Sequence, residues 1–213
     1  VDIASLMWDV PKESISFDNG NVISGDHTAT FPDLLEHHFG FVGGELFGKG
    51  IIRPELGKGT YSAGPVFWEV CIGGVELTLD FETGKIKLNK VVSVADVGKA
   101  VNPSMIKGQE MGGAAQGIGN AMFEEMIFED GQLLNGTLLD YKIPSTSDIA
   151  DEFVSVIVEN EDGPGPYGLK GVGEGILAAI PAAVVNALGD LGVKINELPA
   201  TPERVWKAIQ RME

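Results

Sequence analysis

A short glycine-rich segment carries the residue with the clearest chemical potential in this chain. Glu174 follows Gly171 and Gly173, and it comes directly before Gly175 and a long apolar run. Each glycine weakens a helix interior by roughly 1 kcal/mol, so this cluster indicates close approach of the backbone to another group. A carboxylate on such a loop has the chemistry of a general base aimed at a bound cofactor. The structural alternative is a carboxylate stabilised by the N-terminal dipole of the following helix, and both interpretations stay open at this point.

A second glycine cluster lies in a predicted helix over residues 103–126, where Asn102 and Pro103 are typical of a helix start. The glycines alone favour an explanation by helix packing. Two glutamines, Gln109 and Gln116, are seven residues apart and therefore share one helical face. A buried amide needs partners for both its donor and its acceptor groups, and a polyfunctional cofactor such as a pterin would supply them. The glycines of this segment are Gly108, Gly112, Gly113, Gly117 and Gly119.

Composition excludes several classes of protein. The 213 residues carry a formal charge of −16, with 15 basic against 31 acidic residues, which argues against a nucleic-acid partner. A hydrophobic share of 44% is sufficient for a packed core. The single cysteine, Cys71, excludes a disulfide framework or a cysteine-based metal site, and we interpret it as a strand residue. His27, His37 and His38 lack metal-ligand spacing, so we expect no metal ligand from the chain itself.

No apolar run is long enough for a membrane span and no signal peptide is visible, so we expect no membrane partner. The single cysteine fits a reduced, cytoplasmic setting. The first residue is Val1, and the opening residues are typical of a helix already under way. We therefore expect a fragment or subunit of a larger protein.

Hydrophobic patterning predicts an α+β fold with antiparallel β-ribbons packed against helices. A two-stranded ribbon is expected near residues 75–94, with Ile86, Leu88, Val92 and Val94 on one face of the returning strand. The helix after Glu174 should run through Leu188. The other expected elements are an Asn-Gly hairpin at 17–23, a helix at 31–39, a turn at 130–131, strands at 153–158 and 193–195, and a last helix capped by Thr201 with Val205, Trp206 and Ile209 facing inward.

Eight motifs follow one another along the chain: Tyr61-Ser62-Ala63-Gly64 with Glu69-Val70; Asp96-Val97-Gly98; Val101-Asn102-Pro103; Gly108-Gln109 with Gly112-Gly113-Ala114-Ala115-Gln116-Gly117-Ile118-Gly119; Asp140-Tyr141-Lys142-Ile143-Pro144; Gly165 to Glu174; Pro181-Ala182-Ala183-Val184-Val185-Asn186-Ala187; and Leu198 to Val205. In this order they resemble the C-terminal part of the molybdopterin-binding subunit in the xanthine dehydrogenase/aldehyde oxidase family. The resemblance divides the chain into a weakly matched segment, 1–59, and a C-terminal molybdopterin-binding lobe, 60–213.

The resemblance implies a molybdenum hydroxylase, an oxidoreductase that places water-derived oxygen on an electrophilic carbon of a purine, an N-heterocycle or an aldehyde. Glu174 matches the family's general base, which takes a proton from a molybdenum-bound hydroxide. Gln116 and Gly117 match the cofactor-binding helix, and the backbone of Gly171, Val172 and Gly173 would lie beside the molybdenum. The metal would be held by the sulfurs of the cofactor.

The family also implies partners. The cofactor is a molybdenum–molybdopterin in its simple or its cytosine dinucleotide form, with 2Fe-2S and FAD groups on other domains or subunits. The remainder of the molybdenum subunit would complete the site, so the fragment alone is expected to be inactive. Family members often have Glu-Pro-Pro where this chain has Glu174-Gly175-Ile176. The alternative hypothesis is a non-catalytic structural or assembly module that retains the fold.

Overall fold

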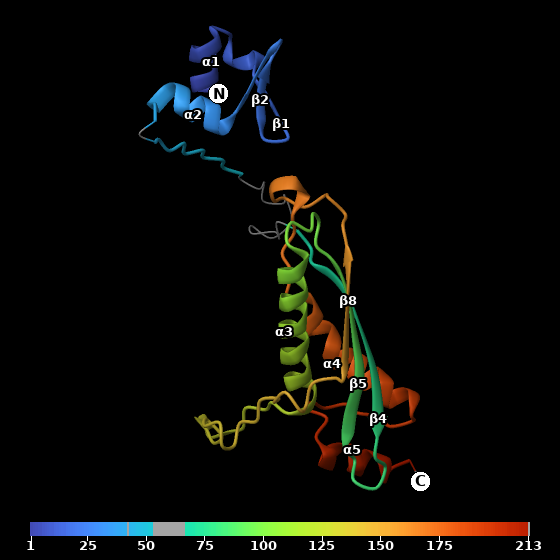
Figure 1. The fold of residues 1–213 in the computed structure, drawn as a ribbon. Helices are drawn as coiled ribbons and strands as arrows, with labels where there is room; N and C mark the ends of the chain where they lie inside the picture. Colours follow the sequence, from blue (N-terminus) through green and yellow to red (C-terminus); the bar gives the residue numbers. More distant parts are fainter. Residues whose placement is uncertain (42, 53–66, 213) are drawn as a thin grey trace, which may run out of the picture. The chain divides into compact units, whose positions relative to one another are not determined.

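The computed structural model describes residues 1–41, 43–52 and 67–212 (Figure 1). The chain divides into two compact units, Val1–Ile51 and Ile52–Glu213. The motif at residues 61–64 lies outside the described residues. Each unit has its own buried core, so each is described by itself.

The first unit is a small layer of three antiparallel strands with two helices. The helices are α1 (Asp2–Trp8) and α2 (Phe31–Phe39), and the strands are β1 (Ser16–Asp18), β2 (Asn21–Ser24) and β3 (His27–Thr30), in the order β1-β2-β3. Asn19 and Gly20 both have positive φ, which a two-residue hairpin turn requires, so the predicted hairpin is confirmed. The predicted helix at 31–39 is also confirmed, and a Thr30–Asp33 capping box begins it.

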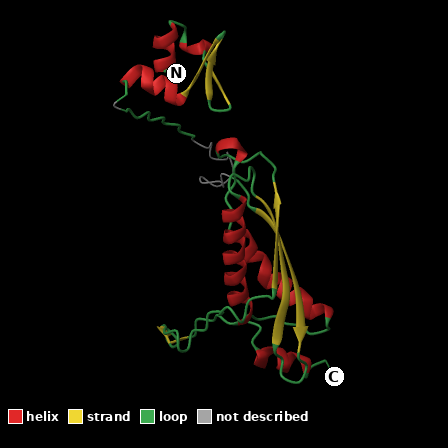
Figure 2. Ribbon diagram, viewed as in Figure 1, coloured by secondary structure: helices red, strands yellow, loops and turns green. Residues whose placement is uncertain are grey.

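The second unit is built on a sheet of three long strands, β4 (Val70–Leu79), β5 (Ile86–Asp96) and β8 (Glu152–Val158), shown in yellow in Figure 2. β5 lies in the centre, antiparallel to β4 and parallel to β8. The sequence predicted β4 and β5 as an isolated ribbon and β8 as a separate strand. The parallel pair was missed because its partners are about sixty residues apart, and no local turn signal joins them.

A bulge in β5 corrects the predicted buried face. Leu88 pairs with Leu77 and Lys90 with Glu76, so Asn89 is an extra residue in the ladder. The side chains change faces at this point, and Val91 and Ala95 are buried where Val92 and Val94 had been expected. Alternation could not reveal this, because both faces of β5 are apolar after the bulge.

Helices α3 (Pro103–Met122) and α4 (Gly175–Asp190) pack on one another and on the sheet (Figure 1). The Asn102 side chain accepts a hydrogen bond from the Met105 amide at 3.1 Å, which confirms the predicted start of α3. α4 provides the apolar centre of the core, and it continues through Pro181. The buried α4 residues are Ile176, Ile180, Val184 and Leu188.

The remaining elements are short. A hairpin of β6 (Phe128–Glu129) and β7 (Gln132–Leu133) confirms the predicted turn at 130–131, since Asp130 and Gly131 have positive φ. Pro166–Gly168 is a 3₁₀ turn, and α5 (Pro202–Ile209) ends the fold.

Two predictions near the C-terminus are wrong. Residues 193–195 form no strand, because they pair with no neighbouring strand, although Val193 and Ile195 are buried in the core. Trp206 is 41% exposed, while Val205 on the same helix is fully buried as expected. Trp206 lies about 100° around the helix from Val205, and the face that packs on the core is the one that carries Val205 and Ile209.

No helix among the described residues combines the length and the hydropathy needed to cross a lipid bilayer.

Candidate functional site

One cavity of the second unit brings most of the predicted site residues together. It has a volume of ≈ 600 Å³, within the range of about 300–1,000 Å³ typical of small-molecule sites. Its walls are one face of α3, the glycine loop before α4, and the segment that leads into β4. The lining residues are Phe67, Glu69, Gly108, Gln109, Gly112, Gly113, Gln116, Gly171, Val172, Gly173 and Glu174.

The α3 wall is a strip without large side chains between two amides. Gln109 and Gln116 both line the cavity, as their seven-residue spacing predicted. Gln109 and Gln116 are both exposed, so the expectation that their amides are buried is wrong. A β-carbon on Gly108 or Gly112 would meet no atom within 4 Å. These two glycines therefore keep the helix backbone open to the cavity.

The other α3 glycines serve packing. A β-carbon on Gly113 would clash with the carbonyl oxygen of Gly173, and one on Gly117 would lie 2.8 Å from Cβ of Ile180. The structure thus divides the glycine cluster between the two explanations, with Gly113 and Gly117 allowing close contact and Gly108 and Gly112 facing open space. Gly117, predicted to bind cofactor, packs against α4 and is not a lining residue, so its cofactor contact stays a prediction.

The glycine loop is fastened to the sheet at its first end by Lys170. Its ammonium group lies 2.7 Å from a carboxylate oxygen of Asp96 and also pairs with Asp162. The hydrogen bonds that Lys170 donates to Asp162 and Asp96 raise the pKa of Lys170, and the one to Asp96 lowers the pKa of that carboxyl. The Lys170 amide also donates to the carbonyl of Val97 at 3.0 Å. Only 7% of the Lys170 side chain is exposed, so this ion pair is well shielded from water.

The second end of the loop is fastened by a residue whose role the sequence did not predict. One carboxylate oxygen of Glu69 accepts hydrogen bonds from the amides of Gly173 (2.9 Å) and Gly175 (3.0 Å). Glu69 was part of a recognised motif, but the pairing spans 104 and 106 residues. No local pattern signals a contact of that range.

Glu174 lies between these two tethered amides. It is the N-cap residue of α4, yet its side chain makes no capping hydrogen bond. The carboxylate is exposed and lines the cavity. An acid at this position therefore forms no side-chain cap, while stabilisation of the carboxylate by the N-terminal dipole of α4 stays open as the structural alternative.

The site residues fit a pterin-type cofactor. The cavity wall presents two side-chain amides, which donate and accept hydrogen bonds, and exposed backbone from two glycine segments. A side chain at Gly108 or Gly112 would project into open space at this wall. Within the described part of the chain, no group of three or more His, Cys, Asp or Glu residues could hold a metal ion. The amides and the exposed backbone suit an organic group with several hydrogen-bonding atoms.

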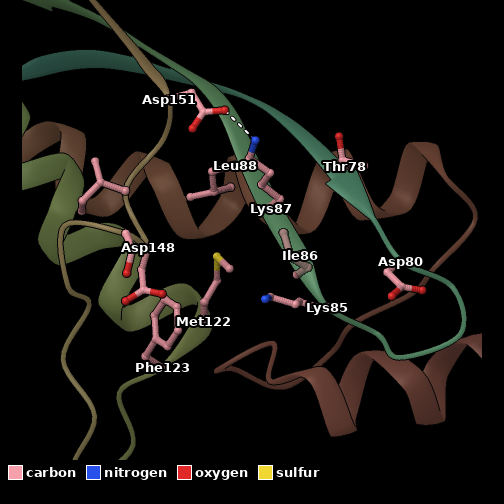
Figure 3. Close-up of a pocket in the computed structure, with 12 residues that line it drawn as sticks. Thr78, Asp80, Lys85, Ile86, Lys87, Leu88, Met122, Phe123, Asp148 and Asp151 are labelled. Carbon is pink, nitrogen blue, oxygen red and sulfur yellow. Dashed lines mark ion pairs between the residues drawn. The ribbon is translucent and has the colours of Figure 1, made fainter.

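A second cavity of ≈ 520 Å³ lies further along α3 (Figure 3). Met122 and Phe123 from the end of α3 face Ile86 and Leu88 of β5 across it. Its rim is charged, and the ion pair Lys87–Asp151 (2.7 Å) is drawn as a dashed line. It contains none of the predicted site residues.

Comparison with known proteins identifies the family. A family model described as "Molybdopterin cofactor-binding domain" matches residues 1–150, so the chain belongs to this family. The family predicted from the eight motifs is thereby confirmed. The match includes the first 59 residues, where the motifs were weak.

The relatives that this chain matches are longer proteins. It is 42% identical over 135 residues to the nicotine 6-hydroxylase large subunit of Paenarthrobacter nicotinovorans, covering 61% of this chain and 16% of the relative. It is 40% identical over 136 residues to a putative xanthine dehydrogenase molybdenum-binding subunit of Escherichia coli K12, covering 62% and 18%. The crystal structure of quinoline 2-oxidoreductase from Pseudomonas putida 86 superposes with a TM-score of 0.75 at 28% identity, covering 98% of this chain and 27% of that one. The chain thus spans about a sixth to a quarter of these relatives, and the likeness confirms the predicted α+β fold.

Proposed function

We propose that this chain forms one wall of the molybdopterin site of a molybdenum hydroxylase, with Glu174 as its general base. The proposed reaction places water-derived oxygen on an electrophilic carbon of a purine, an N-heterocycle or an aldehyde. The observation that carries the proposal is the convergence of Glu174, Gln116 and the Gly171–Gly173 backbone on one cavity. Relatives named as a nicotine hydroxylase and a xanthine dehydrogenase subunit support the reaction class.

When bound, the molybdenum–pterin group supplies the redox chemistry and the oxygen that is transferred. Gln116, with Gln109 beside it on the helix, offers amide donors and acceptors to the pterin rings. The backbone from Gly171 to Gly173 would allow the group to come close, because two of these three residues have no side chain. Gly173 has φ +132°, a conformation that a side chain would strain.

Glu174 accepts and holds the proton in this proposal. Its carboxylate lines the cavity. The backbone on both sides of Glu174 is held by the hydrogen bonds from the amides of Gly173 and Gly175 to Glu69. A fixed position matters because proton transfer requires hydrogen-bond reach, about 2.6–3.2 Å between heavy atoms. Other walls of the site, the substrate contacts, and the iron–sulfur and flavin groups would come from the remainder of the enzyme.

The test is Glu174→Gln in the assembled enzyme that contains this chain. The amide keeps the shape of the side chain and cannot act as a base at neutral pH. We expect turnover to fall by about 10²–10⁴-fold, the usual contribution of a general base, with molybdenum content unchanged. Near-normal turnover would refute the base assignment. An assembled enzyme without bound cofactor or turnover would instead favour a structural or assembly module.

A further inference from the structure

The carboxylate of Glu69 stands out among the polar groups that the proposed reaction does not use. It belongs to the segment leading into β4, is half-buried, and lines the same cavity as Glu174. One carboxylate oxygen of Glu69 accepts hydrogen bonds from the amide of Gly173 at 2.9 Å and from the amide of Gly175 at 3.0 Å. These are the residues immediately before and after Glu174. One side chain therefore fixes both backbone neighbours of the proposed base.

The loop needs such a contact from outside. Gly173 and Gly175 have no side chains to restrict them, and glycine is the most flexible residue in the unfolded chain. The first amides of α4 lack partners within the helix, and Glu174 does not cap them with its own side chain. Glu69 supplies that acceptor from a distant part of the chain. Hydrogen bonds to a charged acceptor are the stronger kind, which suits a contact that must hold a loop in one position.

Packing against β4 supports the same conclusion. A β-carbon on Gly175 would lie 2.8 Å from Cβ of Cys71 and 3.1 Å from the Glu69 oxygen. The start of α4 therefore packs closely against the beginning of β4. Glu69 directly precedes β4, which belongs to a three-stranded sheet, so its hydrogen bonds connect the loop that carries Glu174 to the end of that sheet.

We infer that Glu69 is a positioning residue for Glu174: it aims the base through the amides of Gly173 and Gly175. This inference rests on the proposed function and adds to it a residue with no predicted role. Displacing a catalytic group by about 1 Å can cost 10²-fold in rate, so the loss of this contact should appear mainly in kcat.

The experiment compares Glu69→Ala and Glu69→Gln in the assembled enzyme, with Glu76→Ala as the matched control. Glu76 is an exposed glutamate on β4, outside the cavity lining. Hydrogen exchange of the peptide 171–176, molybdenum content, and kcat and KM per bound molybdenum are measured. For Glu69→Ala we expect exchange of the Gly173 and Gly175 amides to rise at least about 10-fold and kcat to fall about 10–100-fold, with KM within about 3-fold. Glu69→Gln retains an acceptor oxygen, so it should restore most of the protection and of kcat.

A double-mutant cycle separates positioning from a general structural role. If Glu69 acts through Glu174, then adding Glu69→Ala to Glu174→Gln should cause little further loss of turnover. Unchanged amide exchange in Glu69→Ala, or a full additional loss in the double variant, would overturn the inference. So would a loss of activity that merely follows lost molybdenum. Failure of the proposed function is distinguishable, because it appears as normal turnover in Glu174→Gln alone.

Discussion

The hydroxyl of Ser93 donates a hydrogen bond of 2.7 Å to the carboxylate of Glu110, between β5 and α3. Ser155 donates to the other oxygen of the same carboxylate. The two serines are paired residues of the neighbouring parallel strands β5 and β8. Glu110 is only 1% exposed, so one buried side chain links α3 to both strands. This contact sets the position of the helix that carries Gln109 and Gln116.

Removing the carboxylate should therefore destabilise the second unit. Glu110→Ala leaves two hydroxyls without their acceptor and opens a cavity, which should lower the free energy of unfolding by about 2–3 kcal/mol. Glu110→Gln should lose less, because its amide oxygen still accepts one hydroxyl. Urea unfolding measures both, with the exposed Glu76→Ala as a control expected within about 0.5 kcal/mol of the parent. Equal stability of Glu110→Ala and the parent would contradict a stabilising role.

The Lys170–Asp96 pair predicts a pH dependence of stability. The pKa of Asp96 is lowered in the folded state, chiefly by the hydrogen bond from Lys170. A lowered folded pKa contributes stability above the unfolded value, about 3.9, and this contribution is lost as pH falls through the folded pKa. Asp96→Asn should therefore be less stable than the parent at neutral pH. Below about pH 4 this difference should shrink.

The measurement is urea unfolding of Asp96→Asn and the parent between pH 3 and pH 7. Asp190→Asn, at the exposed end of α4, is the control for losing one carboxylate. Its difference from the parent should stay small throughout. A difference for Asp96→Asn that is constant across this range would show that the pair does not link stability to pH.

Elements with local signals could be predicted from the sequence. The Asn19–Gly20 turn, the Asn102 cap of α3 and the Thr201 cap of α5 each depend on bonds within three residues. Elements that depend on partners far apart in the chain could not be predicted from the sequence. The parallel pairing of β5 with β8 and the bulge at Asn89 follow from packing across the sheet, and side-chain alternation gives no sign of either.

The candidate site also contains residues that local patterns predict and residues that only long-range contacts define. The glycine loop and Glu174 were evident because a glycine cluster around one carboxylate contradicts ordinary helix and strand preferences. Glu69 and Glu110 were missed, since a glutamate in a strand or helix pattern is usually a surface residue. Only the folded chain brings Glu69 to amides more than a hundred residues away.

Substitutions at Gln116 and Gly117 should distinguish a residue that binds the cofactor from one that packs the core. Gln116→Leu removes an exposed amide from the cavity wall, so stability should stay within about 0.5 kcal/mol while bound pterin and molybdenum decrease. Gly117→Ala places a methyl group 2.8 Å from Cβ of Ile180 and should cost about 1–3 kcal/mol. Thermal unfolding and cofactor analysis of the assembled enzyme measure both effects. If Gly117→Ala lost cofactor at unchanged stability, Gly117 would belong to the cofactor site as the sequence predicted.

Gly112 and Gly113 are neighbours on α3 with opposite expected effects. A methyl group on Gly112 meets open space, so Gly112→Ala should stabilise the helix by about 0.5–1 kcal/mol and reduce cofactor content, because the methyl group occupies the cavity. Gly113→Ala should destabilise by about 1–3 kcal/mol, because its methyl group meets the Gly173 carbonyl and lies 2.7 Å from Ile176 Cγ2. Denaturant unfolding and molybdenum content test the pair. Full cofactor content in Gly112→Ala would mean that the α3 wall does not contact the cofactor, and the open glycines would need another explanation.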